Sequence, residues 1–352
     1  HLSNIFSGVL QSQPHYFNDL EKIVKLWIHE SERIYSDRLV SKKDIIEYRN
    51  ISVDILKKSF SKYTSIQKFY AGEKSEPLIF NNFPKGYQGE RFYGQVTFEE
   101  TEKNVKEALR DYNDQNVEMK LVLFEDAIKH VCRVTRIVSE SGGHALLVGV
   151  GGSGKQSLSK LAAFICELSV FSITVSSSYN TDNLRTDLIE LYKKSGEKDY
   201  GIMFLITDSH ITNEKFLVYI NDLLSSGEIA DLYNEDDKLN IINAIRPKAK
   251  AEGANVDTAD RVWSWFIDRV RKNLHVTLCF SPVGDTFKTR SRRFPGLINS
   301  TVIDWFHPWP EEALKKVTKM FLDETLTEIE VTDETMKNNI MNFMPYSFEI
   351  AN

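Results

Sequence analysis

The chain of 352 residues carries 44 Lys and Arg against 50 Asp and Glu, which gives a formal net charge of −6. This acidic balance argues against nucleic acid as the main partner, because such binders neutralise phosphates with basic residues. No apolar run approaches the roughly 20 residues that cross a bilayer, so we expect no membrane partner, and the length predicts two or three packed units.

The cysteines and histidines do not predict a disulfide or a metal site. Cys132, Cys166 and Cys279 are far apart in apolar surroundings, which predicts buried thiols in a reducing compartment. The eight histidines show no spacing typical of metal ligands. The first residues, His-Leu-Ser-Asn-Ile-Phe, lack the pattern of a secretory signal, and we expect the chain to be cut from something longer.

The first seventy residues are predicted to be helical. Apolar residues recur at helical spacing from Phe17 to Tyr35 and again from Val53 to Tyr63. The stretch from Ala71 to Gly94 then collects glycines and prolines with little periodicity. Such a composition predicts a connection, so we expect a domain boundary there.

Beyond this connection, five short apolar runs alternate with longer helical stretches. The alternation predicts a mostly parallel five-stranded sheet covered by helices on both faces, which is an α/β nucleotide-binding architecture. After Trp309, Pro310 and two glutamates open a predicted helix, and residues 332–343 predict another. The expected strands are Ala145–Val148, Val170–Val175, Ile202–Ile206, Leu274–Phe280 and Val302–Phe306.

The most specific motif is the segment Gly-Val-Gly-Gly-Ser-Gly-Lys at residues 149–155, between the first expected strand and a helical stretch from Ser157 to Leu168. In this context glycines let backbone N–H groups close around phosphate oxygens, and the lysine reaches the terminal phosphates. The alternative is a flexible turn, which the lysine directly after the last glycine disfavours. We predict that a nucleotide binds at Gly149, Gly151, Gly152, Ser153, Gly154 and Lys155.

The next residue departs from the usual pattern of this loop. Gln156 stands where a Ser or Thr hydroxyl normally coordinates Mg²⁺. Ser157 follows, but it points about 100° further round the helix and cannot simply substitute. We expect both residues to border the nucleotide and metal binding to be weakened.

The third expected strand ends in Thr-Asp-Ser, where the acidic residue of a Walker B motif meets Mg²⁺. Asp208 is therefore the predicted magnesium-side carboxylate. A helix cap or turn residue is the alternative, which the upstream phosphate loop disfavours. Ser209 follows in place of the glutamate that would activate water, and a hydroxyl is a poor base at neutral pH. The sequence thus predicts nucleotide binding with slow or absent hydrolysis.

Two further positions are candidates for contact with a phosphate. Ser281 follows the fourth expected strand, where a polar side chain could sense the γ-phosphate. Arg290 and Arg292 lie in a basic run before the last strand, placed to reach a neighbouring subunit's nucleotide. A solvated basic loop is the alternative, and the residues alone leave both interpretations open.

Together these motifs resemble the fourth AAA+ module of dynein heavy chains, and the axonemal outer-arm type more than the cytoplasmic type. The helical start, at residues 2–8 and 35–40, resembles the small subdomain that closes the third module. The similarity covers most of residues 80–350. It rests on Leu-Val-Leu-Phe-Glu-Asp-Ala at 121–127, the phosphate loop with Gln-Ser-Leu after it, Phe-Leu-Ile-Thr-Asp at 204–208, Ile-Asn-Asp-Leu-Leu at 220–224, Ile-Ile-Asn-Ala-Ile-Arg-Pro at 241–247 and Ile-Asp-Trp-Phe-His at 303–307.

The resemblance implies an α/β AAA+ P-loop NTPase with a five-stranded parallel sheet, flanked by small all-α subdomains. Residues 1–75 would close the third module, 76–308 form the large subdomain of the fourth, and 309–352 begin its small subdomain towards the stalk. ATP or ADP with Mg²⁺ is the implied ligand, with 121–124 bordering the adenine and Ser281 as first sensor. The implied arginine fingers, which act on the module before, are Arg290 and Arg292.

The resemblance also implies partners and a place of action. The partners are neighbouring AAA+ modules of the same heavy chain, dynein intermediate and light chains, and the microtubule through the stalk of the parent protein. The place is the cytoplasm and cytoskeleton, in the axoneme of a cilium or flagellum. The expected function is a regulatory nucleotide-binding module of a microtubule motor.

Two other functions remain open. An active AAA+ remodelling ATPase would need a catalytic glutamate where Ser209 stands. A structural ring module that binds no nucleotide is favoured by Gln156 and Ser209 but disfavoured by the intact glycines, Lys155 and Asp208.

Overall fold

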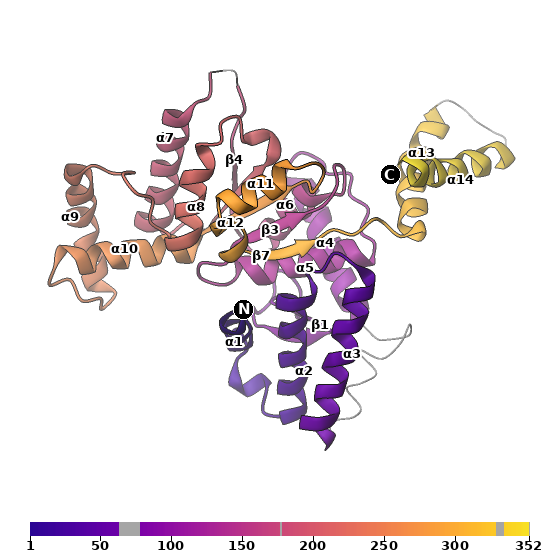
Figure 1. The fold of residues 1–352 in the computed structure, drawn as a ribbon, viewed down its shortest axis with the longest axis horizontal. Coiled ribbons are helices and arrows are strands. Elements are labelled where there is room, and N and C mark those ends of the chain that lie inside the picture. Colours follow the sequence, from indigo (N-terminus) through magenta and orange to yellow (C-terminus); the bar gives the residue numbers. More distant parts are fainter. Residues whose placement is uncertain (63–77, 177, 329–333, 352) are drawn as a thin grey trace.

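The N-terminal part is helical throughout in the computed structural model, which describes residues 1–62, 78–176, 178–328 and 334–351. The predicted helical start is confirmed over the described part, although the second long helix begins at Lys42, earlier than Val53, and its predicted end at Tyr63 lies outside the described residues. The elements are α1 (Leu2–Leu10), the 3₁₀ turn η1 (Pro14–Tyr16), α2 (Leu20–Ser31), the π-helical turn η2 (Glu32–Ser36) and α3 (Lys42–Ser59) (Figure 1).

A two-stranded antiparallel sheet joins these helices to the rest of the chain. Its strands are β1 (Ile79–Asn81), which falls in the stretch from Ala71 to Gly94 predicted only as a connection, and β2 (Gly94–Val96), which begins at the end of that stretch. Strands of three residues give too little alternation to be recognised. Phe80 and Tyr93 are nevertheless buried in one apolar cluster with α2. The predicted boundary after residue 75 lies outside the described residues.

Five parallel strands form the central sheet in the order β4-β5-β6-β3-β7, which confirms the predicted architecture. Because the strands are parallel, the residues that follow them meet at one edge of the sheet. The edge strand β4 ends at Ser172, so the predicted residues up to Val175 leave the sheet. The strands are β3 (Ala145–Val148), β4 (Ser169–Ser172), β5 (Ile202–Thr207), β6 (Leu274–Phe280) and β7 (Val302–Trp305).

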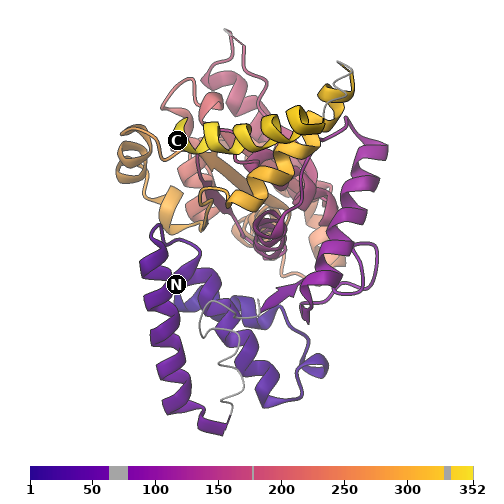
Figure 2. The same cartoon turned by 90° about the vertical axis from the view of Figure 1, so that its right-hand side faces the viewer.

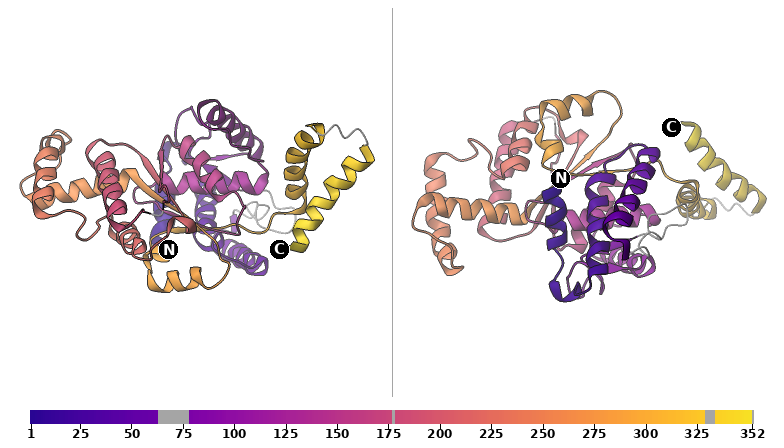
Figure 3. Two further views of the ribbon diagram at one scale, coloured as in Figure 1. Left: turned by 90° about the horizontal axis from the view of Figure 1, so that it is seen from above. Right: turned by 60° about the horizontal axis from the view of Figure 1, so that its bottom comes forward.

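Helices cover both faces of this sheet (Figures 2 and 3). Met203 and Leu205 of β5 face one side and Phe204 and Ile206 the other, as the alternation of side chains along a strand requires. The first side packs against α4 (Phe98–Gln115), α5 (Glu125–Val138) and α6 (Lys155–Ile165). On the second side, the apolar cluster includes residues of α7 (Thr181–Tyr192), α8 (Phe216–Ser226), α9 (Glu235–Ala251) and α10 (Ala259–Asn273). The π-helical turn η4 (Lys193–Glu197) contacts α7 and α10, and α9 packs against α10.

Two helices, α13 (Glu311–Glu328) and α14 (Glu334–Ala351), follow the sheet and lie side by side (Figure 1). The carbonyl of Pro310 accepts hydrogen bonds from the third and fourth residues after it, so Pro310 directly precedes the predicted helix. The second helix extends beyond its predicted end at residue 343, and its predicted start at 332 lies outside the described residues. In the described ranges, no helix is long and apolar enough to cross a membrane.

The three cysteines are free thiols. Cys132 and Cys279 are buried as predicted, while Cys166 is half-buried. Burial raises the pKa of both Cys132 and Cys279 to about 12, so these thiols stay protonated and unreactive at neutral pH.

A buried ion pair fastens the N-terminal helices to the α/β part. Glu30 on α2 and Arg136 on α5 are 0% and 1% exposed, and Arg136 Nε donates to Glu30 Oε2 at 2.8 Å. The Tyr93 hydroxyl donates to Glu30 Oε1 at 2.6 Å. Burial and the Glu30 charge together raise the pKa of Tyr93 well above its usual value. These bonds offset the cost of removing two charges from water.

His144 makes the stability of the fold depend on pH. Its Nδ1 accepts a hydrogen bond from the Val276 N–H at 3.0 Å, so the ring is neutral. Burial, together with nearby His275, lowers its pKa from 6.5 to about 3. Between these values the unfolded chain holds a proton that the folded chain lacks, so stability falls as the pH falls.

We expect His144→Asn to reduce the slope of unfolding free energy against pH by about 1.4 kcal/mol per unit between about pH 6 and 5. The asparagine oxygen can accept the same hydrogen bond without a titrating group. Urea unfolding at several pH values measures the slope, with the exposed His15→Asn as control. An unchanged slope in His144→Asn would contradict the interpretation.

Candidate nucleotide-binding site

The loop between β3 and α6 has a backbone conformation that requires glycine. Gly152 and Gly154 have φ angles of 76° and 85°, left-handed values that other residues rarely adopt. A Cβ on Gly149 would lie 2.6 Å from the Cβ of Phe306. The loop leads directly into the N-terminus of α6, which begins at Lys155, two residues before the predicted start at Ser157, and ends at Ile165, before the predicted end at Leu168. Such a helix terminus favours bound phosphate.

Lys155, the first residue of α6, makes hydrogen bonds to three residues of the loop. Its Nζ donates to the carbonyl oxygens of Gly149 and Val150, both at 2.7 Å, and to Ser153 Oγ at 3.0 Å. The side chain is 9% exposed, and burial lowers the pKa of its amine, which the nearby Asp208 charge opposes. The lysine therefore holds the loop in shape and carries positive charge where phosphates are expected.

The two residues after the lysine differ in position. Gln156 is exposed and is not among the residues that line the cavity beside the loop. Ser157 is half-buried and does line it. Of these two predicted nucleotide contacts, the structure brings only Ser157 to the cavity.

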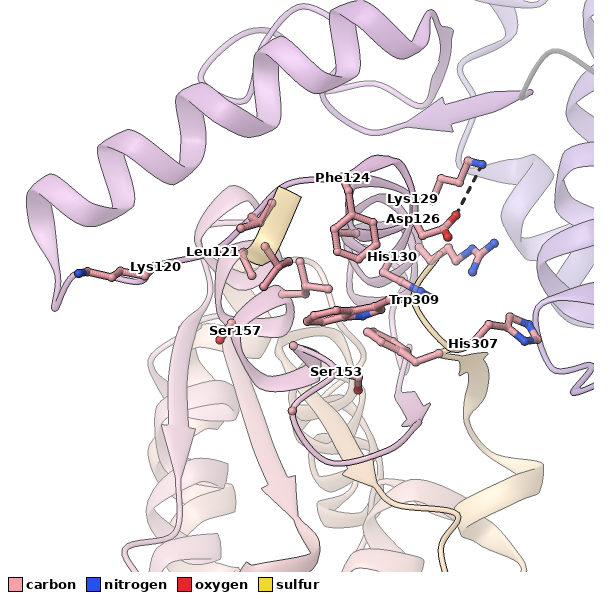
Figure 4. Close-up of a pocket in the computed structure, with 18 of the residues that line it drawn as sticks. Lys120, Leu121, Phe124, Asp126, Lys129, His130, Ser153, Ser157, His307 and Trp309 are labelled. Atoms are coloured by element: carbon pink, nitrogen blue, oxygen red, sulfur yellow. Dashed lines mark ion pairs between the residues drawn. The ribbon is translucent and has the colours of Figure 1, made fainter. Parts of the chain in front are cut away.

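A cavity of about 260 Å³ lies beside the loop (Figure 4). Leu121, Val122 and Phe124 line one wall, as expected for a segment that borders a nucleobase. Trp309 packs edge-to-face against Phe124, with 5.6 Å between the two ring centroids, and lines the same cavity. Val317 and Phe321 of α13 complete the apolar walls, and Gly152, Ser153 and Gly154 bring the phosphate loop to the same cavity.

A buried chain of charges forms another wall. His130 Nδ1 lies 2.6 Å from Asp304 Oδ2, and Arg133 Nη1 donates to Asp304 Oδ1 at 2.8 Å. Burial opposes the charge of Asp304, but His130 and Arg133 outweigh it and lower its pKa to about 2. Arg133 also lies 3.2 Å from Asp37, beyond η2. The wall of the cavity is thereby joined to the N-terminal helices.

Asp208, directly after β5, has both carboxylate oxygens engaged. Oδ2 accepts the Ser281 N–H at 2.7 Å, and Oδ1 accepts Arg290 Nη1 at 2.9 Å. The Ser281 hydroxyl accepts from the Val283 N–H at 3.3 Å. The predicted Walker B and sensor residues thus meet at the edge of the sheet. Their partner Arg290, however, was predicted to face another module.

The two candidate finger arginines lie in the helix α11 (Thr286–Arg293), not in the basic loop that was the alternative. Arg290 is 7% exposed and points into this chain, where its Nε and Nη2 donate to Glu214 Oε1 at 3.0 and 2.8 Å. Arg292 is exposed. Of the two candidates, only Arg292 is exposed in this structure.

Sequence reasoning missed several residues of the site: Glu214, His130, Arg133, Asp304 and Trp309. For Asp304 and Trp309 the sequence offers one signal, their place along the chain. Asp304 lies in the last predicted strand and Trp309 follows that strand, near the edge of the sheet where ligands bind. His130 and Arg133 lie on one turn of the amphipathic helix α5, where polar residues ordinarily form a solvated face, so sequence alone gives no signal for them.

Comparison with known proteins identifies the family. A family model described as the P-loop containing dynein motor region D4 matches residues 119–352, and one described as an AAA+ lid domain matches residues 1–68. The chain belongs to the dynein heavy chains. The fold and the resemblance predicted from its motifs are confirmed.

This dynein segment is homologous over its full length to axonemal heavy chains. It is 49% identical over all 352 residues to the dynein alpha chain of the flagellar outer arm of Chlamydomonas reinhardtii. Identity is 44% over 98% of the chain to the ciliary dynein beta chain of Heliocidaris crassispina, and 43% over the whole chain to dynein axonemal heavy chain 17 of Mus musculus. The chain spans 8% of each relative, so it corresponds to part of the motor region. Membership of this P-loop region implies use of a nucleotide and Mg²⁺.

Proposed function

We propose that this segment is a regulatory module that holds ATP or ADP and hydrolyses ATP slowly or not at all. The observation that carries the proposal is the phosphate loop with Lys155 at the edge of an aromatic-lined cavity. Backbone N–H groups at a helix N-terminus suit phosphates. Phe124 and Trp309, in edge-to-face contact, form an apolar aromatic wall that suits the face of a base. Together they favour a nucleotide ligand over an empty scaffold.

Slow hydrolysis is proposed because the position after Asp208 holds a serine. The Ser209 hydroxyl shares a hydrogen bond of 2.8 Å with Thr207 Oγ1, and it cannot take a proton from water at neutral pH. Asp208 itself is bonded to Arg290 and to the Ser281 N–H. These contacts support binding more than they support an active remodelling ATPase.

In the ring of the parent heavy chain, we assign residues 1–75 to the end of the third module, 76–308 to the large subdomain of the fourth and 309–352 to the start of its small subdomain. Arg292 is the finger that we assign to the preceding module's nucleotide, since it is the exposed one of the pair. The assigned partners are the adjacent modules, the intermediate and light chains, and the microtubule through the stalk. The relatives are named as flagellar, ciliary and axonemal, and we propose the same location.

The regulatory role follows from the contacts of the cavity wall. Arg133 bonds Asp304 at the cavity and contacts Asp37 next to the N-terminal helices, so a bound nucleotide can bias how these parts pack. We propose that the nucleotide bound to this module regulates how the closure of other AAA+ modules in the ring is transmitted to the stalk.

A titration with fluorescent ATP and a single-turnover assay on the 352-residue chain test the proposal. We expect micromolar binding, with turnover at least about 100-fold slower than the ~10 s⁻¹ typical of enzymes. Turnover near that typical rate would favour an active ATPase instead. Absence of binding at micromolar nucleotide would favour the structural ring module.

A further inference from the structure

We propose that the nucleotide at this site is bound without a resident Mg²⁺, because the Arg290 guanidinium supplies the cation beside Asp208. The inferred ligand is a metal-free nucleoside diphosphate, and ADP is the probe. This inference rests on the nucleotide-binding function proposed above. It differs from the usual P-loop arrangement, in which a loop hydroxyl and the Walker B carboxylate hold the metal ion.

The groups that would hold Mg²⁺ do not fit that role in this chain. The loop hydroxyl is replaced by the amide side chain of Gln156, which is exposed. The carboxylate of Asp208 accepts Arg290 Nη1 at 2.9 Å on one oxygen and the Ser281 N–H at 2.7 Å on the other. A magnesium ion demands near-ideal octahedral oxygen ligands, so both losses weaken its binding.

Arg290 is held in place by three charge-assisted hydrogen bonds. Besides the bond to Asp208, its Nε and Nη2 donate to Glu214 Oε1 at 3.0 and 2.8 Å. Its guanidinium carbon lies 5.9 Å from the ring centroid of Phe280, the last residue of β6, and the residue is only 7% exposed. A buried arginine whose three nitrogens each donate to a carboxylate is held in one position.

The positive charge of Arg290 lies at the end of the site where the phosphates are expected. Asp208 is close enough to Lys155 for its charge to act on the pKa of that amine. Lys155 in turn bonds the backbone of the phosphate loop. Lys155 and Arg290 therefore both act on Asp208, Arg290 by direct contact and Lys155 through the charge on its amine, at the edge of the sheet where β3 and β5 end.

Removal of Arg290 has a specific consequence. The carboxylates of Asp208 and Glu214 both contact the Arg290 guanidinium, so the two carboxylates lie close to each other. Their side chains are 40% and 44% exposed, within reach of solvent ions. Without the arginine, two neighbouring carboxylates repel each other and attract a divalent cation. Arg290→Gln is therefore expected to create a Mg²⁺ dependence that the native chain lacks.

Calorimetric titration of the 352-residue chain with ADP, in excess Mg²⁺ or in EDTA, tests this inference. The native chain is expected to bind ADP with affinities that differ by less than about threefold between the two buffers. Arg290→Gln is expected to bind about tenfold more weakly in EDTA and to recover when Mg²⁺ is added. Arg290→Lys, which keeps the charge, should restore binding in EDTA.

Arg293→Gln is the matched control, since Arg293 is an exposed arginine on the same helix and its loss changes the net charge equally. It is expected to leave both affinities unchanged. Glu214→Gln retains Arg290 beside Asp208 and should also stay independent of Mg²⁺.

A native chain that loses about tenfold or more of its ADP affinity in EDTA would overturn the inference, while the proposed nucleotide binding would stand. Absence of ADP binding in both buffers would overturn both proposals. If Arg290→Gln does not fold, as judged by thermal unfolding, the comparison of buffers on the native chain and on Glu214→Gln decides the question.

Discussion

Replacement of Arg136 by methionine is expected to lower the free energy of unfolding by about 3–5 kcal/mol. The change leaves the Glu30 carboxyl group 0% exposed and without the guanidinium that now bonds both of its oxygens. Tyr93 would remain its hydrogen-bond donor, but a single hydroxyl does not neutralise a buried charge. Urea unfolding followed by circular dichroism measures the loss.

The exposed pair of Arg110 and Asp111 provides the control, because it lies 3.4 Å apart with Arg110 69% exposed. Arg110→Met is expected to cost less than about 1 kcal/mol. The double variant Glu30→Leu with Arg136→Met should recover much of the loss, since it removes both charges from the interior. A loss below about 1 kcal/mol in Arg136→Met alone would show that the pair is not buried as described.

Replacement of Lys155 by alanine is expected to weaken ADP binding by about 100-fold, because charge-assisted hydrogen bonds contribute about 1.5–3 kcal/mol each. The lysine also bonds two carbonyl oxygens of the phosphate loop, so its loss removes both a positive charge and a support of the loop. The fold should persist, because β3 and α6 are held by apolar contacts on the sheet. Calorimetric titration with ADP measures the affinity.

Lys160→Ala is the control for this second prediction, as it removes an equal charge from the same helix away from the cavity. It is expected to leave ADP affinity unchanged. If Lys155→Ala binds ADP within about threefold of the native chain, the phosphate loop does not carry the affinity. In the parent motor, the same variant should alter microtubule release or velocity, and unchanged motility with unchanged nucleotide content would contradict the regulatory role.

The sequence by itself determined the features that depend on neighbouring residues. The strand before the loop, the glycines at 149–154 and Lys155 lie within a few positions of one another, so their spacing encodes both the turn and its chemistry. The five strands were recognisable because each is a short apolar run between helical stretches. The positions of Ser209 and Gln156 alone likewise predict slow hydrolysis and weakened metal binding, which stay predictions.

Only the tertiary structure decided which distant side chains meet. Arg290 contacts Asp208 and Glu214, which lie 82 and 76 residues earlier, because β5 and β6 are neighbours and present their ends at one edge. Sequence spacing contains no record of strand order, so it could not distinguish an arginine that faces another module from one that neutralises its own site. The same reason hid Trp309 from the list of site residues. Whether the metal ion or the arginine serves this nucleotide is therefore a property of the folded chain.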